Sequence, residues 1–354
     1  MGANDWRWER LLVTLPIGPP YEPMELQQVE AIPDGPQWQY EPKWDGFRCV
    51  AFRDGDEIYL QSKAGEPLAR YFPEIVDQLR ALQARSFVLD GELMVQLGDA
   101  LSFDALLQRI HPAATRVQRL AKETPARYVL FDMLVDADGS DLTGSPLERR
   151  RSALERFSKR YLQHTGIVLS PATIERAQVD AWFARVGNAL DGVVAKRRDR
   201  SYASGARDAG VKIKHLRTAD CVIGGYRLNK EKNGVGSLLL GLYDEDGKLN
   251  HVGFTSGFRA DERGPLLKRL QPLEKPPGFT GSAPGGPSRW QKTEEPWFPL
   301  EPKLVVEVRY DHVTGERFRH GTKILRWRTD KKPRQCTMDQ LIAAEAASPL
   351  ELLS

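Results

Sequence analysis

The chain has 354 residues, which is room for two domains that each bury a core of their own. It is 41% hydrophobic and 28% charged with a net charge of +3, and no run of about 18 apolar residues predicts a membrane span. The first residues lack the layout of a secretory signal. The cysteines Cys49, Cys221 and Cys336 are too scattered for a disulfide framework or a zinc site. We therefore expect a protein of the reducing cytoplasm.

The distribution of charge is more informative than its sum. Residues 317–334 carry eight Lys or Arg against one acid, interleaved with Phe318 and Trp327. We name these residues the basic stripe. Such a stripe is typical of surfaces that contact phosphate backbones. A solvated charged strand explains the same residues equally well when nothing else supports the first interpretation.

The first half of the chain has mixed periodicities. A proline-rich, irregular lead-in covers residues 1–37. Alternating segments at 47–53 and 57–63, joined by Asp54-Gly55, predict a hairpin. Apolar spacing predicts helices at 71–82, 102–110 (with Ser102 as N-cap) and 145–162, and another ending near Leu190. Further strands are expected at 86–96, 128–135, 167–170 and 191–197. This mixture predicts an α+β domain built on antiparallel sheet.

After Leu216 the pattern changes to short strands separated by Gly, Asn and Asp turns. A five-stranded, partly open barrel of the OB type is the simplest interpretation. We expect a flexible insertion near 275–290, where Gly and Pro accumulate. The predicted division is a lead-in packed on the core (1–37), a first domain (38–216) and an OB domain (217–354).

The sequence EPKWDGFR at residues 41–48 contains a candidate nucleophile, Lys43. A lysine between a strand and a glycine turn lies at an exposed rim. It can attack an electrophile only as the neutral amine, which requires a pKa depressed by nearby cations or a metal ion. The motif is weak by itself, because a surface lysine beside a turn is the commoner explanation.

Charged residues in other apolar strands strengthen the case. Asp90 and Glu92 share one face of a strand by its two-residue period. Asp191 and Lys196 occupy a similarly apolar segment, where charges are costly to bury unless they find a cation or ligand.

Lys212 and Lys214 also share a strand face, where like charges repel unless an anion lies between them. Each pair alone also fits an edge-strand charge or a structural ion pair. Together these residues describe a groove with several lysines and two acids capable of binding metal. That combination suits a nucleoside triphosphate with Mg²⁺.

The ordered set KWDG, a Ser-Lys step, LDGEL, VLFDML, DGVVAK, VKIK and RTDK resembles the motifs of the ATP-dependent DNA ligase superfamily. The resemblance runs from about Gln39 to Lys331 and is closest to the small bacterial ligases of the C type. It implies the fold class α+β: a nucleotidyltransferase domain, with ATP-grasp-like antiparallel sheets and helices, followed by a β-barrel OB-fold.

The resemblance also implies roles at the nucleotide. Lys43 would attack the α-phosphate of ATP and carry AMP. Glu41 would hold the adenine edge, Phe131 would stack on the ring, and Arg48 would contact the ribose or the nick phosphate. Lys63 stands where many family members have arginine, and a lysine cannot form a bidentate fork to phosphate.

Glu92 resembles the acid that binds the ribose hydroxyl or the metal. Asp191 replaces the more common Glu with a shorter side chain and is the second candidate metal ligand. Lys196, Lys212 and Lys214 would surround the α-phosphate and stabilise charge that develops there.

Arg328, Asp330 and Lys331 match the late motif, which in the family swings over the nucleotide and orients pyrophosphate. This movement implies a hinge near residues 216–219. Asp45 would shape the loop of the nucleophile.

The expected activity is sealing of nicked duplex DNA in repair. We expect ATP as substrate, Mg²⁺ or Mn²⁺ as the metal, a monomeric enzyme, a repair polymerase as a partner and no membrane association. The alternatives are an RNA ligase or capping-type nucleotidyltransferase, or an inactive DNA-binding OB module.

Overall fold

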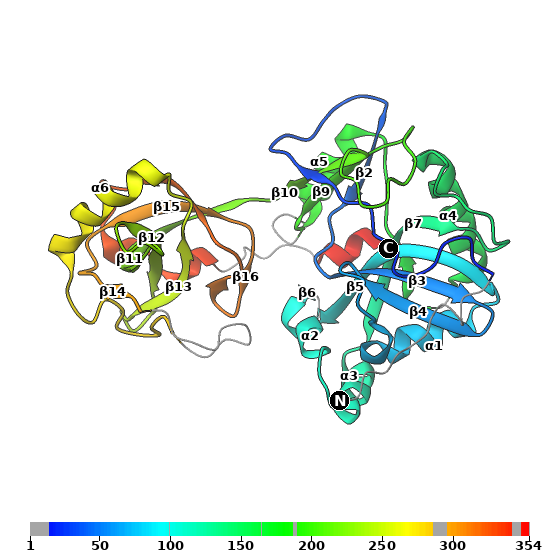
Figure 1. Ribbon diagram of the computed structural model, residues 1–354, viewed down its shortest axis with the longest axis horizontal. Coiled ribbons are helices and arrows are strands. Elements are labelled where there is room, and N and C mark those ends of the chain that lie inside the picture. Colours follow the sequence, from blue (N-terminus) through cyan, green and yellow to red (C-terminus); the bar gives the residue numbers. More distant parts are fainter. Residues whose placement is uncertain are drawn as a thin grey trace. The chain divides into compact units, whose positions relative to one another are not determined.

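A computed structural model describes residues 14–98, 100–163, 165–186, 190–285, 296–341 and 348–353. The chain divides into two compact units (Figure 1). The first contains Met1–His215 together with Glu345–Ser354, and the second is Leu216–Ala344. We call them the adenylation unit and the OB unit, and describe each by itself. No helix among the described residues is long and apolar enough to cross a membrane.

The larger sheet of the adenylation unit has the order β4-β3-β5-β7-β8, with β6 pairing β5. Its strands are β3 (Phe47–Asp54), β4 (Glu57–Ser62), β5 (Ser86–Leu97), β6 (Ala100–Leu101), β7 (Ala126–Val135) and β8 (Ile167–Leu169). Only the β7–β8 pair is parallel among these described strands. The predicted hairpin is confirmed: Asp54 pairs with Glu57, and Gly55 takes the positive φ of +65° that the tight turn requires.

The smaller sheet has the order β1-β10-β9-β2. Its strands are β1 (Gln27–Gln28), β2 (Trp38–Pro42), β9 (Gly192–Arg197) and β10 (Gly210–Lys214). Within the described part of the predicted irregular lead-in, the two-residue strand β1 adds a parallel edge to β10. Trp6 and Trp8 of the lead-in lie outside the described residues.

Helices cover the larger sheet: α1 packs on β4 and β7, and α4 on β7 and β8 (Figure 1). The helices are α1 (Pro73–Ala81), α2 (Phe103–Gln108), α3 (Ala114–Glu123), α4 (Leu147–Tyr161) and α5 (Arg176–Val186), with a 3₁₀ turn η2 (Ala69–Tyr71). The Ser102 hydroxyl caps α2 by accepting from the Ala105 amide at 3.2 Å, as predicted. The sequence pattern does not indicate α3, because this short helix is mostly polar and buries only Val117 and Ala121.

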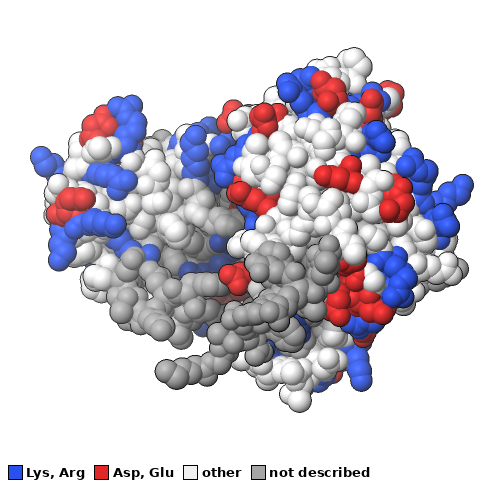
Figure 2. Space-filling model, turned by 45° about the vertical axis from the view of Figure 1, so that its right-hand side comes forward, with Lys and Arg blue, Asp and Glu red and all other residues white. Residues whose placement is uncertain are grey.

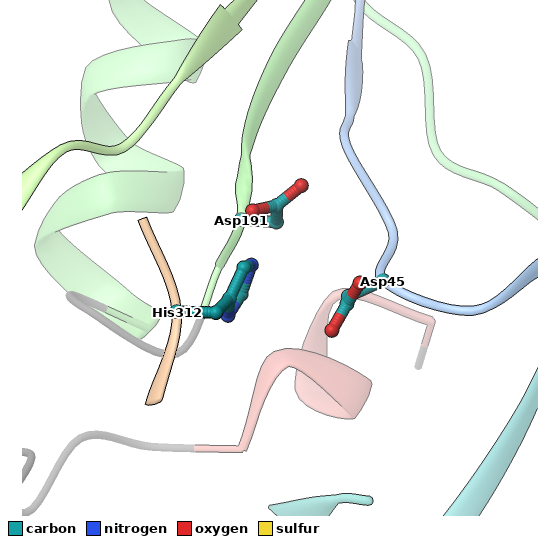
Figure 3. A group of neighbouring side chains, drawn as sticks. All are labelled: Asp45, Asp191 and His312. Atoms are coloured by element: carbon teal, nitrogen blue, oxygen red, sulfur yellow. The ribbon is translucent and has the colours of Figure 1, made fainter. Parts of the chain in front are cut away.

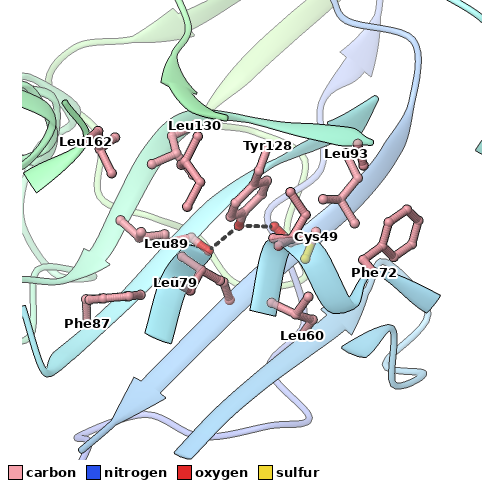
Figure 4. Close-up of a cluster of buried hydrophobic side chains, with 14 of the residues drawn as sticks. Cys49, Leu60, Phe72, Leu79, Phe87, Leu89, Leu93, Tyr128, Leu130 and Leu162 are labelled. Carbon is pink, nitrogen blue, oxygen red and sulfur yellow. Dashed lines mark hydrogen bonds between the residues drawn. The ribbon is translucent and has the colours of Figure 1, made fainter. Parts of the chain in front are cut away.

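Apolar residues of the larger sheet and its helices form a closely packed core (Figure 4). Tyr128 is fully buried within it. Its hydroxyl lies 2.8 Å from the Cys49 carbonyl oxygen and 3.0 Å from that of Leu89. Because a buried hydroxyl is costly without a partner, this sharing ties β3, β5 and β7 together at one point.

The OB unit contains a six-stranded sheet of order β13-β12-β11-β15-β18, with β14 pairing β11. Its strands are β11 (Arg217–Leu228), β12 (Val235–Tyr243), β13 (Leu249–Thr255), β14 (Phe298–Pro299), β15 (Val305–Tyr310) and β18 (Lys323–Trp327). A parallel bridge between Thr255 and Thr322 joins the two ends of this sheet into the predicted barrel. A small hairpin is formed by β16 (Val313–Thr314) and β17 (Arg317–Phe318).

The helical parts of the OB unit are α6 (Ala260–Leu270), η4 (Gln271–Leu273), η5 (Pro333–Gln335) and η6 (Met338–Leu341). The sequence pattern does not indicate α6, which contains Pro265 and buries only Leu270. Only residues 215 and 216 separate β10 from β11, so the hinge predicted at 216–219 falls largely on a strand.

Two predictions about chain segments need correction. Residues 275–285 are not a free insertion, because Phe279 is 4% exposed in the OB core and Lys275 donates its amide to Pro299 at 3.0 Å. Residues 286–290 lie outside the described residues. The OB unit also does not keep the C-terminal residues: the 3₁₀ helix η7 (Pro349–Leu353) packs in the adenylation unit.

Candidate active site

A pocket in the adenylation unit collects most of the predicted site. It is lined by Pro23, Met24, Glu25, Leu26, Glu41, Pro42, Lys43, Trp44, Arg48, Lys63, Glu92, Phe131, Val194, Lys196 and Lys212. Eight of these residues were candidates from the sequence. Asp191 reaches the pocket through Lys43, whereas Arg328 and Lys331 belong to the OB unit.

Lys43 directly follows β2, and its amide donates to the Gly192 carbonyl at 3.0 Å. Its ammonium forms an ion pair with Asp191, whose side chain is 3% exposed against 22% for Lys43. Burial lowers the pKa of Lys43, but the Asp191 carboxylate raises it, helped by Glu92 and Asp45, and the net shift is upward. The expected depressed pKa is therefore not found: in this arrangement the lysine holds its proton.

The glycines after Asp45 and Asp191 explain why both acids lie where they do. A Cβ on Gly46 would come within 2.2 Å of the Leu93 carbonyl oxygen, and one on Gly192 within 2.0 Å of that of Ile213. Both Asp-Gly steps therefore let the backbone pass close to a neighbouring strand. Figure 3 shows Asp45 on the loop after β2 and Asp191 just before β9.

At the other end of the pocket, Lys196 forms a buried ion pair with Glu41 at 2.7 Å, and both side chains are less than a tenth exposed. The side-chain amide nitrogen of Gln39 donates a hydrogen bond to the other Glu41 carboxylate oxygen at 2.8 Å. The Lys196 ammonium also lies 4.6 Å from the Phe131 ring centroid. Lys196 was expected among the phosphate-binding lysines. In the structure its ammonium is instead paired with Glu41 beside the Phe131 ring.

Arg48 is held by an acid that the sequence did not link to it. Its Nε and Nη2 donate to the two oxygens of fully buried Asp90, each at 2.5 Å. The Tyr202 hydroxyl donates to the same carboxylate at 2.6 Å, and the guanidinium carbon lies 4.7 Å from the Phe131 ring centroid. Asp90 therefore orients Arg48 over the aromatic ring.

Glu92 pairs in register with Arg48 across β3 and β5 and lines the pocket. Burial raises the pKa of Glu92 to about 7, although the charges of Arg48 and Lys43 oppose the shift. The face shared by Asp90 and Glu92 thus contains one acid bound to arginine and one directed to the pocket.

An acid of the lead-in, Glu25, pairs with two cations at the cationic side of the pocket. Glu25 accepts from Lys63 at 2.6 Å and from Arg207 at 2.7 Å. Burial lowers the pKa of Lys212, and the nearby charges of Lys43 and Lys63 lower it further. Lys214 lies two residues along β10, opposite Gly192. The sequence gave no signal for Glu25, which precedes the first motif.

In the OB unit, Asp220 on β11 binds two basic residues of the late motif. Arg328 donates to both Asp220 oxygens at 2.8 and 3.0 Å, and Lys331 donates at 2.8 Å. Arg328 also forms a two-point contact with Asp330 at 2.9 and 2.8 Å. The sequence identified the motif but not the acid that holds it.

Several cations of the basic stripe have partners within the OB unit. Arg317 contacts the His251 ring at 2.9 Å, Arg326 pairs with Glu307 at 2.5 Å, and Arg334 donates to the Gly247 carbonyl at 2.6 Å. Figure 2 shows basic and acidic side chains interspersed over one face of the molecule. Several cations of the basic stripe are therefore already engaged within the OB unit, and contact of the stripe with DNA stays a prediction.

Comparison with known proteins agrees with this site. Residues 24–214 match the family model "ATP dependent DNA ligase domain", and residues 231–331 match "ATP dependent DNA ligase C terminal region". The chain therefore belongs to the ATP-dependent DNA ligases.

Among individual relatives, the chain is 45% identical to DNA ligase C1 of Mycolicibacterium smegmatis and 44% identical to DNA ligase C of Mycobacterium tuberculosis. Each match covers 92% of this chain and 95% of the relative. A solved structure from a study of Lig E DNA ligases superposes with a TM-score of 0.54 at 17% identity, covering 87% of this chain and 99% of that one. The last likeness concerns the fold alone. The chain is an ATP-dependent DNA ligase of the C kind, and ATP is its adenylate donor.

Proposed function

We propose that Lys43 is the residue that carries AMP and that the enzyme seals nicks in duplex DNA. The observation that carries this proposal is the position of Lys43 in one pocket with a base-sized aromatic end and a cationic end. The neutral Lys43 amine attacks the α-phosphorus and gives up a proton as the P–N bond forms, while the bond to the pyrophosphate oxygen breaks. An oxygen of the nick 5′-phosphate then attacks the same phosphorus, and the lysine nitrogen takes up a proton and leaves as the amine when the P–N bond breaks. Finally the 3′-hydroxyl attacks the 5′-phosphorus, loses its proton and releases AMP.

The aromatic end of the pocket suits adenine. The amino group of adenine donates and its neighbouring ring nitrogen accepts, which complements the Glu41 carboxylate and the Lys196 ammonium. Guanine presents the opposite pattern on that edge. We therefore assign Lys196 to the base and not to the α-phosphate, with Phe131 as the stacking surface.

The cationic end suits the phosphates. Lys212, Lys214 and Lys63 would neutralise the triphosphate and the nick phosphate, because charge neutralisation and in-line positioning dominate phosphoryl transfer. Arg328 and Lys331 of the late motif would orient pyrophosphate, once they have exchanged their ion pairs with Asp220 for contacts with the phosphates.

The acids beside Lys43 fit a divalent cation. Carboxylate oxygens of Asp45 and Asp191 lie within 4.8 Å of one another, and oxygen donors are what Mg²⁺ and Mn²⁺ take in proteins. Asp191 and Glu92 would hold the ion, with Asp45 beside them. A bound cation supplies positive charge at the leaving phosphates. Drawing the Asp191 carboxylate away from Lys43 would remove the contact that keeps its amine protonated.

The proposal extends to the physiological setting. We propose that the substrate is nicked duplex DNA in repair, that the enzyme acts as a monomer in the cytoplasm, and that a repair polymerase supplies its nicks. The relatives named above are DNA ligases by name, which supports the DNA substrate.

A labelling experiment tests the proposal. The protein is incubated with Mg²⁺ and either α-labelled ATP or α-labelled GTP, and then with nicked duplexes made of DNA or with RNA-containing strands. We expect label from ATP only, lost in Lys43→Ala, and sealing of the DNA nick. Transfer of GMP, or sealing restricted to RNA strands, would replace the proposal with a capping-type or RNA ligase activity.

A further inference from the structure

The last described segment of the chain returns to the adenylation unit. After the OB unit, η7 packs against β6 and α5. Leu352 is 8% exposed, and Leu350 and Leu353 are partly buried in the same cluster. Arg185 of α5 pairs with Glu351 at 3.0 Å. The adenylation unit is therefore built from two segments that are far apart in sequence.

The cluster that receives η7 supports both members of the Lys43–Asp191 ion pair. Trp44, the residue after Lys43, is buried in it and donates its indole N–H to Ser170 at 2.9 Å. Leu190 and Val193 flank Asp191 and belong to the same cluster. In Figure 3 the C-terminal helix lies beneath the loop that carries Asp45. Leu352 therefore belongs to the same buried cluster as the chain neighbours of the nucleophile and of its acid.

We propose that Leu352 is a positioning residue for the adenylation step. By filling the cluster behind Trp44 and Leu190, it fixes the loop of Lys43 and the start of β9 at the distance that the reaction with ATP requires. Close packing makes this support stiff, so that loss of a few methyl groups is felt by the neighbours. A displacement of about 1 Å at a reacting group can cost roughly 100-fold in rate. The proposal rests on Lys43 being the nucleophile.

The three chemical steps separate positioning from general damage. The Lys43 amine takes part when AMP is loaded and when it is transferred to the 5′-phosphate. A nick that already carries AMP on its 5′-phosphate bypasses both steps and needs only the 3′-hydroxyl. A defect in Lys43 placement should therefore slow self-adenylation and leave sealing of the pre-adenylated nick almost intact.

The test uses the full chain with Leu352→Ala, and Leu352→Met as the conservative variant. Glu351→Gln is the matched control, because Glu351 is the neighbour of Leu352 in η7 and its side chain pairs with Arg185 of α5 at the surface. At saturating ATP we expect Leu352→Ala to lower the rate of Lys43 labelling by ~10- to 100-fold, with pre-adenylated sealing within ~3-fold of the original. Leu352→Met should restore most of the labelling rate, and Glu351→Gln should change neither step.

Equal losses in both steps, or an unchanged labelling rate, would overturn the proposal. If Leu352→Ala does not fold, Leu352→Val provides a smaller truncation, and the ratio of the two rates decides in the same way. Failure of the unmodified protein to take label from ATP would instead overturn Lys43 as nucleophile, so the two failures are distinguishable.

Discussion

The nucleotide pocket contains two lysine–carboxylate pairs that differ in how far they are sealed from solvent. In the Lys196–Glu41 pair both side chains are buried, and Gln39 satisfies the remaining oxygen. In the Lys43–Asp191 pair the acid is buried but the lysine is partly open to the pocket. We therefore expect the Lys196–Glu41 pair to stay intact when ATP binds, and the Lys43–Asp191 pair to be exchangeable.

Desolvation explains the difference. A buried charge whose partner is removed stays uncompensated, so a sealed pair is difficult to break. An ammonium at the edge of a pocket can exchange its carboxylate for phosphate or leave it to a cation at lower cost. With the roles proposed above, the comparison implies that the adenine end is formed before ATP arrives, whereas the Lys43 end must be rearranged.

Removal of the nucleophile should have the largest effect. Lys43→Ala should abolish labelling by ATP and ATP-dependent sealing, because no other step can load AMP. Both are measured with labelled ATP and a nicked duplex. Lys43→Arg is the control, since it keeps the positive charge but offers no neutral amine, and it should also fail. Residual AMP on the Ala variant would place the nucleophile elsewhere.

Breaking the sealed pair should chiefly cost stability. Glu41→Gln leaves the Lys196 ammonium buried without its carboxylate, and we expect a loss of about 3–5 kcal/mol in the free energy of unfolding. Denaturant titration measures it, together with the KM for ATP, which should rise. The double variant Glu41→Gln, Lys196→Met should recover part of the stability but not the KM. A loss in the free energy of unfolding as small as that for a surface ion pair would show that the Lys196–Glu41 pair is not sealed from solvent.

Breaking the Lys43–Asp191 pair should chiefly cost activity and leave stability nearly unchanged. Asp191→Asn should leave the free energy of unfolding nearly unchanged, while self-adenylation falls by roughly 10- to 100-fold and needs more Mg²⁺. Asp191→Glu should be tolerated, because it keeps the charge. The readouts are labelling rates over a Mg²⁺ titration and a denaturation curve. A large stability loss with normal metal dependence would make this pair structural.

The smallest effect is expected at the exposed edge of the pocket. Lys63 pairs with Glu25 while more than half exposed, so Lys63→Arg should change stability by less than ~1 kcal/mol. The guanidinium can bind phosphate through two hydrogen bonds, which should raise sealing by a few-fold at most. Sealing rates at two salt concentrations measure this. A loss of sealing would mean that the ammonium itself is required.

Local patterns in the sequence predicted what short-range physics determines. The hairpin of β3 and β4, the cap at Ser102 and the glycine turn after Lys43 follow from turn and capping chemistry. The family's motif order brought eight candidates into one pocket.

Long-range pairing is what the sequence did not reveal. Lys196 lies on the strand expected for it, but its partner Glu41 is determined by the β2–β9 pairing, not by any local pattern. The same holds for Glu25 beside Lys63 and for Asp220 beneath Arg328. Leu352 was assigned to the wrong unit, because a short apolar segment after the barrel fits either unit and the sequence order favours the OB unit.

The return of η7 has a consequence for synthesis. Chains emerge from the ribosome N-terminus first, and domains generally fold as they emerge. The adenylation unit departs from this order: Leu352 reaches its place only after the entire OB unit has been translated. Nascent chains interrupted within the OB unit would therefore lack Leu352 in the buried cluster that contains Trp44 and Leu190. If Leu352 positions Lys43 as proposed, such chains would load AMP more slowly than the full chain.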